Sequence, residues 1–298
     1  MIVKGEKKIR KYNIRILFVV GLIIFLFPFV LRIISYFNQT TAIYNYKSEI
    51  SNSSKAEIEN RIATSEEYNK KIADESLTVS IGDELNSNNA ESNSVFDFLK
   101  TGTVIGTLII PKINVNLPLY DGLSNDNLQK GVVHLSDTSY PTGQTSTHSV
   151  IAGHSGLTRA KILDDLDKLE VGDTFQIEYL NQLSNYEVIS IKIVLPEETE
   201  SLRIQKNETL VTLVTCTPKS INTHRLLVTA KKVDFPEQKE LTKKEKIISF
   251  LKKYYIYMVI FAFMVTAIIV AIVVRNKKLK SKNKVENKVE IVNKNKEE

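Results

Sequence analysis

Cysteine is nearly absent from this 298-residue sequence, in which Cys216 is the only one. A single cysteine forms no intramolecular disulfide, and it excludes every structural zinc site that needs two or more thiolates. Cys216 is therefore either a small buried apolar side chain, the ordinary role of a lone cysteine, or a residue that carries out chemistry.

Charge is missing from two long apolar runs. Residues 16–31 form the first, which continues beyond Arg32 and reaches about the length that a helix needs to cross a hydrocarbon core. The second, residues 254–274, has 21 residues without a charge. Both predict transmembrane helices. A cleaved signal peptide is the alternative for the first run, but no small-x-small cleavage site follows it.

The formal net charge of +6 arises largely at the two ends of the chain. Six Lys and Arg residues precede the first apolar run, and cytoplasmic flanks are rich in such residues, so we expect the N-terminus to lie in the cytoplasm. With a second span, the chain is a two-pass protein of the cell membrane whose residues 38–253 lie outside. The basic ends lack interleaved aromatic residues, which argues against a nucleic-acid partner.

These features divide the chain into seven parts. They are a cytoplasmic N-terminus (1–13), a transmembrane helix (14–37), an extracellular helical stalk with a possible lid loop (38–100), a β-rich domain (101–236), a linker (237–253), a second transmembrane helix (254–274) and a cytoplasmic basic tail (275–298).

The stalk is predicted from residues 38–77, which lack Gly and Pro and carry apolar residues at helical spacing. Ser53 or Ser54 is a candidate N-cap. The apolar stripe is thin, so we expect it to pack on the chain's own domain rather than on a partner helix. Residues 80–94 are rich in turn residues and predict a loop.

From Thr103 onward, short β-branched runs alternate with turn residues, which predicts a β-barrel or a β-sandwich. One segment differs. Residues 160–170 carry Ile162, Leu163, Leu166 and Leu169 at positions that share one face of a helix, so we expect a helix there.

Three residues of this domain suit acyl transfer. A cysteine attacks as its thiolate, which needs a base or a cation nearby, and the developing oxyanion needs a donor. Cys216 and His154 each end an apolar run, and Arg225 opens the next run nine residues after the cysteine. Two adjacent strands joined by such a loop bring Cys216 and Arg225 side by side at a strand end, a usual place for a site.

The motifs around these residues resemble those of class C sortases, the pilin-polymerising cysteine transpeptidases. The strings TLVTCTP and NTHRLLV resemble the family's cysteine and arginine signature, and HSVIAGHSGL resembles its histidine motif. Further similar strings are IPKINVNLPLYDG, GVVHLSDTSYPTG and AKILDDLDKLEVGDTF, so the resemblance covers about residues 106–233, with a weaker echo in the stalk, EEYNKKI.

The resemblance implies a mainly β fold, an eight-stranded sortase-type barrel over residues 101–236. It also implies cleavage of an LPXTG-type sorting signal between Thr and Gly, with the acyl group held as a thioester and passed to a lysine amine of a pilin. Cys216 is then the nucleophile, His154 the proton donor to the leaving amine, and Arg225 the group that stabilises the carbonyl oxygen. Gly153, Thr215 and Thr217 are expected to contact the substrate.

This chain departs from the family pattern at two places. Class C enzymes usually carry an Asp-Pro-aromatic lid motif before the barrel. Here Asp83, Glu84 and Leu85 are the candidate lid, with Asp97-Phe98 as a second possibility. Lys219 and Ser220 stand where the family commonly has Tyr-Gly.

Other functions compete with this interpretation. The same residues with water as acceptor make a surface cysteine peptidase, and a decayed site makes a non-catalytic scaffold. A housekeeping sortase that joins surface proteins to a cell-wall precursor amine is the nearest rival, although a C-terminal span favours the pilin class. No metal or cofactor is expected, because His134, His148 and His224 have no metal-ligand spacing. The acidic residues Asp164, Asp165, Asp167 and Glu170 are interpreted as a solvated helix face rather than a calcium site.

Overall fold

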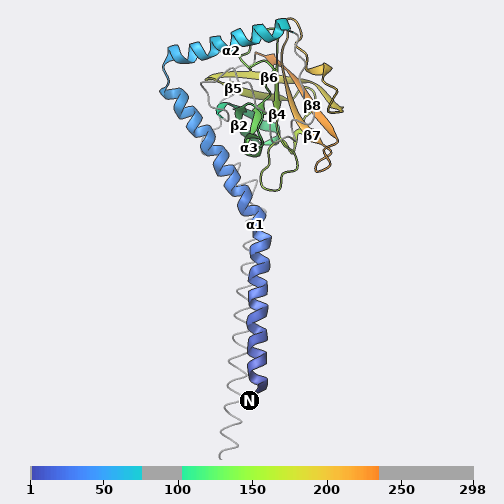
Figure 1. Ribbon diagram of the computed structural model, residues 1–298. Helices are drawn as coiled ribbons and strands as arrows, with labels where there is room; N and C mark the ends of the chain where they lie inside the picture. Colours follow the sequence, from blue (N-terminus) through green and yellow to red (C-terminus); the bar gives the residue numbers. More distant parts are fainter. Residues whose placement is uncertain (1, 76–102, 235–298) are drawn as a thin grey trace, which may run out of the picture. The chain divides into compact units, whose positions relative to one another are not determined.

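The computed structural model describes residues 2–75 and 103–234, with side chains for residues 20–73 and 103–234. Within the second range, eight strands close into a barrel in the order β1-β2-β3-β4-β7-β8-β6-β5 (Figure 1). The predicted eight-stranded barrel is thereby confirmed. The strands are β1 (Val104–Ile110), β2 (Val115–Asp121), β3 (Val132–His134), β4 (Thr147–Ala152), β5 (Thr174–Tyr179), β6 (Gln182–Val194), β7 (Thr209–Thr217) and β8 (His224–Val233).

The barrel is mostly antiparallel, but two pairs are parallel. Strand β2 pairs parallel with β3, and β4 pairs parallel with β7. The connection from β2 to β3 contains the short helix α3 (Asn125–Lys130), whose N-cap Ser124 accepts a hydrogen bond from the Asn127 amide. Single 3-10 turns interrupt other connections, namely η2 (Pro111–Ile113), η3 (Leu166–Lys168) and η4 (Glu200–Leu202).

The helix expected at residues 160–170 is not present. This segment is a series of turns that contains only the 3-10 turn η3. Its four apolar residues are nevertheless all buried in the main core. Asp164 explains part of the difference, because its Oδ1 accepts a hydrogen bond from the Gly156 amide at 2.9 Å, and such side-chain bonds to backbone compete with helix formation.

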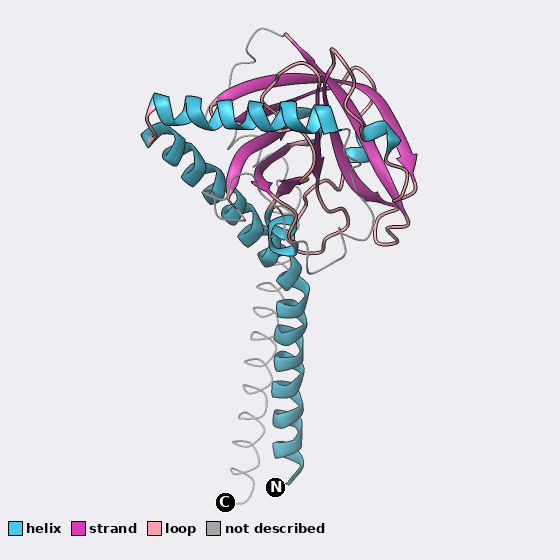
Figure 2. Cartoon of the chain, turned by 45° about the horizontal axis from the view of Figure 1, so that its top comes forward, coloured by secondary structure: helices cyan, strands magenta, loops and turns pink. Residues whose placement is uncertain are grey.

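The stalk consists of two helices rather than one (Figure 2). Helix α1 runs from Ile2 to Asn52 and helix α2 from Lys55 to Glu75. The break at Ser53 and Ser54 agrees with the predicted cap, since the Ser54 hydroxyl accepts a hydrogen bond from the Glu57 amide at 3.1 Å. The chain remains helical through residue 37, where the first transmembrane helix was expected to end.

Helix α1 is the one helix among the described residues that is long and apolar enough to cross a membrane, over Val20–Asn52. The second predicted span, residues 254–274, lies outside the described residues. The C-terminal part of α1 packs on the barrel: Tyr46 is buried, its hydroxyl accepts a hydrogen bond from the Leu180 amide at 2.9 Å, and Lys47 pairs with Glu178 at 2.7 Å.

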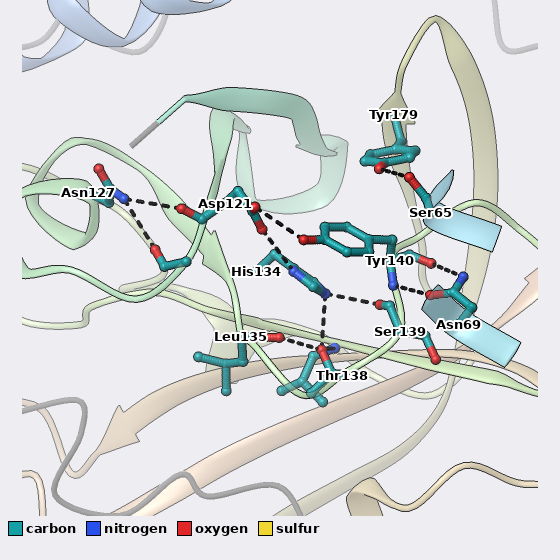
Figure 3. A network of polar contacts seen from close by, with 12 residues as sticks. Ser65, Asn69, Asp121, Asn127, His134, Leu135, Thr138, Ser139, Tyr140 and Tyr179 are labelled. Atoms are coloured by element: carbon teal, nitrogen blue, oxygen red, sulfur yellow. Dashed lines mark hydrogen bonds and ion pairs between the residues drawn. The ribbon is translucent and has the colours of Figure 1, made fainter. Parts of the chain in front are cut away.

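Helix α2 also packs on the barrel, as expected for the apolar stripe. Ile58, Ile62 and Tyr68 contact the main core. Two buried polar residues lie among them: the Ser65 hydroxyl hydrogen-bonds the Tyr179 hydroxyl at 2.7 Å, and Asn69 bonds the backbone of Tyr140 (Figure 3). The helix is therefore held on the barrel by specific hydrogen bonds as well as by apolar contact.

Candidate active site

Strands β7 and β8 place Cys216 and Arg225 side by side, as the sequence predicted. The two residues are directly paired in the antiparallel register of these strands. Both are buried, Arg225 at 2% and Cys216 at 8% exposure. The guanidinium Nη1 of Arg225 donates hydrogen bonds to the backbone carbonyls of Asn222 and His224 at 3.1 and 3.3 Å, so the loop between the strands holds it.

His154 is brought to the same place by β4. This strand runs parallel to β7, with Ala152 opposite Val214, so continuing the register by two residues places His154 beside Cys216. Hydrogen bonds support the continuation. The Gly153 amide donates to the Val214 carbonyl at 3.0 Å, and the Ser155 hydroxyl donates to the Cys216 carbonyl at 2.5 Å. The residues on both sides of His154 are thus bonded to β7.

Burial sets the protonation of the resting site. It raises the pKa of the Cys216 thiol above its usual value, and the positive charge of Arg225 only partly offsets this. Burial also lowers the pKa of His154. Both shifts follow from the cost of removing a charge from water. The neutral thiol and neutral imidazole therefore predominate near neutral pH, and the thiolate–imidazolium pair is the minor form.

The three predicted substrate-contacting residues have different environments. Thr215 is buried and its hydroxyl donates to the Gly153 carbonyl at 2.7 Å, which ties β7 to the residue before His154. A Cβ on Gly153 would lie 2.8 Å from a side-chain carbon of Leu163, closer than atoms of a packed interior approach. Thr217 is only partly buried. Their contact with substrate remains a prediction, and the candidate lid residues Asp83, Glu84 and Leu85 lie outside the described residues.

A pocket of about 190 Å³ opens beside Cys216. It lies between the turns that follow His154 and the loop that follows β7, and its polar lining includes Ser155, Asp164, Asp167 and Lys219. Sequence reasoning did not assign these residues to the site. Asp164 and Asp167 were interpreted as a solvated helix face, because their apolar neighbours have helical spacing. The segment instead forms turns, which place both carboxylates at the pocket beside Cys216.

A closed eight-stranded barrel with a cysteine near the end of β7, an arginine at the start of β8 and a histidine just after β4 is the arrangement of the sortase cysteine transpeptidases. Residues 108–233 match the sortase domain family. With the structural relatives described next, this shows that the chain belongs to the sortase family.

The similar solved structures are class C sortases. A crystal structure of Streptococcus agalactiae sortase C1 is 38% identical, with a TM-score of 0.60, over 65% of this chain and 98% of that one. Streptococcus pneumoniae sortase C is 36% identical with a TM-score of 0.58, over 66% and 98%. Clostridium perfringens sortase C, solved with the C-terminal cell wall sorting motif, is 36% identical with a TM-score of 0.56, over 66% and 100%. The predicted class is thereby confirmed.

Curated relatives match over a shorter length. Sortase D of Bacillus subtilis is 34% identical over 121 residues, which are 41% of this chain and 58% of that protein. Sortase A of Streptococcus agalactiae is 29% identical over 131 residues, which are 43% and 52%. The chain therefore spans less than two thirds of these relatives.

Proposed function

We propose that this protein is a pilin-polymerising transpeptidase of the cell surface, which cuts an LPXTG-type sorting signal between Thr and Gly and joins the new carboxyl end to a lysine amine. The observation that carries the proposal is the juxtaposition of Cys216, His154 and Arg225 by two strand registers. The class C structural relatives support it.

In the first half of the reaction, the Cys216 thiolate attacks the threonyl carbonyl carbon. The carbonyl oxygen gains negative charge, and the guanidinium of Arg225 is the donor positioned to stabilise it. The scissile C–N bond then breaks, and the imidazolium of His154 gives its proton to the leaving amine of glycine. A thioester on Cys216 and a neutral imidazole remain.

In the second half, a lysine amine attacks the thioester carbonyl and the C–S bond breaks. His154 takes a proton from the attacking nitrogen, which restores the thiolate–imidazolium pair. Splitting the transfer in this way lets the acyl group wait on the enzyme for its acceptor.

The apolar helix α1 supports a location at the membrane. We propose that α1 anchors the barrel on the outer side of the cell membrane, and that residues 254–274 return the chain to the cytoplasm. The substrates would then be pilins or other surface proteins that carry sorting signals. A cell-wall precursor amine is the alternative acceptor.

The test uses the full chain in detergent micelles, mixed with an LPXTG-type peptide with and without a lysine-containing pilin fragment. We expect cleavage between Thr and Gly, a thioester on Cys216 by intact-protein mass spectrometry, and an isopeptide-linked product. Cys216→Ala should abolish all three. Cleavage to the free acid alone in the presence of the pilin fragment would identify a peptidase. No cleavage and no thioester would overturn the catalytic assignment.

A further inference from the structure

The pocket beside Cys216 is small and acidic. Its volume of about 190 Å³ is below the roughly 300–1,000 Å³ typical of sites for drug-sized ligands, so it suits one side chain rather than a whole molecule. Two carboxylates, those of Asp164 and Asp167, line it together with Cys216. A pocket of this size and charge next to a thioester suits the end of a single basic side chain.

One primary ammonium group already lies at the pocket. The Nζ of Lys219 is 3.2 Å from Oδ2 and 3.4 Å from Oδ1 of Asp167. Both side chains are about half exposed, at 43% and 52%. Exposed ion pairs of this kind are weak, so another ammonium group can replace Lys219 at little cost.

Asp164 offers a second acceptor. Its Oδ1 is bonded to the Gly156 amide, whereas its Oδ2 is buried and accepts no hydrogen bond from any residue that the structure describes. A buried acceptor without a donor is costly. A lysine ammonium has three donors, so it can bond Asp167 directly and also bond Asp164 once that carboxylate turns its buried Oδ2 toward the pocket.

We propose that the acceptor lysine of the joining reaction enters this pocket, displaces Lys219 from Asp167, and is bound by the carboxylates of Asp167 and Asp164 beside the thioester. Asp167 and Asp164 are then the residues that select a lysine side chain as acceptor, and Lys219 competes with it. This inference rests on the proposed function.

The joining reaction removes two protons from the lysine nitrogen. The bound ammonium loses one proton to His154, and the neutral nitrogen attacks the thioester carbonyl carbon. The C–N bond forms, the C–S bond breaks with its electron pair on sulfur, and the second proton passes to water. Amide, thiolate and imidazolium are the products.

The experiment separates the two half-reactions in the full chain in detergent micelles. Thioester formation is measured with the sorting-signal peptide alone, and joining is measured against the concentration of a lysine peptide. In Asp167→Asn and Asp164→Asn we expect the half-saturating lysine-peptide concentration to rise about tenfold or more, since hydrogen bonds to charged groups are strong. Thioester formation should change far less.

Three comparisons sharpen the test. Lys219→Ala should lower the half-saturating concentration, because it removes the competing ammonium. Hydroxylamine, which is largely uncharged at neutral pH, should cleave the thioester equally fast in wild type and in the Asp variants. Asp126→Asn, which removes an exposed Lys130-paired carboxylate on α3, is the matched control and should change nothing.

The outcomes are distinct. The inference is overturned if wild type and both Asp variants form the thioester and have the same half-saturating lysine-peptide concentration. The proposed function would then remain intact. If the Asp variants form no thioester, Lys219→Ala decides, and an unchanged or raised half-saturating concentration overturns the inference. Absence of a thioester in the wild type overturns both.

Discussion

At the scale of single residues, burial shifts the pKa values of the proposed nucleophile and the proposed acid in opposite directions. The pKa of Cys216 lies above its usual value and the pKa of His154 below it. As pH rises, the active thiolate–imidazolium pair appears as the first proton leaves and disappears as the second leaves. The rate of thioester formation should therefore be bell-shaped, and only a minor fraction of the enzyme is active at its maximum.

The charge of Arg225 is the one influence that opposes the effect of burial on Cys216. In Arg225→Ala we expect the Cys216 pKa to rise further, because the substitution removes the opposite charge that stabilises the thiolate. The measurement is the pH dependence of Cys216 alkylation by iodoacetamide, which needs no substrate and reports one thiol because the chain has one cysteine.

Arg225→Lys is the matched variant. It keeps a positive charge, so its alkylation midpoint should lie between those of wild type and Arg225→Ala. An Arg225→Ala midpoint equal to or below that of wild type would show that the guanidinium does not stabilise the thiolate, and would leave only its role toward the carbonyl oxygen.

At the scale of elements, helix α2 is held by Asn69. Its side-chain oxygen accepts from the Tyr140 amide at 2.7 Å, and its nitrogen donates to the Tyr140 carbonyl and the Thr142 hydroxyl at 3.0 and 3.2 Å. Tyr140 continues into the barrel, where its hydroxyl donates to Asp121 at 3.1 Å and its ring stacks on His134. Figure 3 shows the hydrogen bonds that link Asn69, Tyr140, Asp121 and His134 as one network.

Asn69→Ala removes the side-chain acceptor of the buried Tyr140 amide and one of the donors to the Tyr140 carbonyl, which still accepts from the Thr142 amide at 2.8 Å. We expect a loss of about 2 kcal/mol in the free energy of unfolding and a fall in Tm of about 6 °C for a domain of this size. Near-UV circular dichroism of the detergent-solubilised chain measures it. Asn60→Ala, at an exposed position of the same helix, should shift Tm by less than about 2 °C. Equal shifts in the two variants would mean that Asn69 contributes only helix propensity.

The elements also show which parts of the fold were predictable. Strands β4 and β7 are buried almost throughout, and β8 is buried over residues 225–228, so all three appear in the sequence as apolar runs. The ends of these runs therefore located Cys216, His154 and Arg225. The interpretation of residues 160–170 was wrong because four buried apolar residues fit both a helix and a series of turns. The bond from Gly156 to Asp164 and the bond from the Leu163 amide to the His154 carbonyl favour the turns, and Gly156 has a φ of +78° that favours glycine.

The polar contacts of α2 were beyond prediction for a related reason. Ser65 and Asn69 lie on the buried face, among Ile58, Ile62 and Ile72, but a hydropathy pattern counts them as polar. Their partners, Tyr179 and Tyr140, are 114 and 71 residues away in the sequence. Such hydrogen-bonded pairs form only when the barrel closes, so the sequence around each residue does not indicate its partner.

At the scale of the whole molecule, α1 connects the apolar run to the site. Its side chains Ile24, Phe25 and Phe27 are more than half exposed, as expected for a helix in lipid. Arg32, the first charge after the run, donates from Nε to the Thr158 carbonyl at 3.2 Å. This contact places the turns that follow His154 next to the end of the apolar run, so an anchored barrel would work close to the membrane surface.

The two-pass arrangement is testable because Cys216→Ala leaves a chain without cysteine. We expect a membrane-impermeant maleimide to label a Glu197→Cys variant of that chain in intact cells, since Glu197 is exposed between β6 and η4. A Ser281→Cys variant should be labelled only after the cells are permeabilised, because positively charged segments that follow a span stay inside. Labelling of both in intact cells would leave α1 as a single span with the C-terminal residues outside, and pilin joining would then have to be catalysed from one anchor.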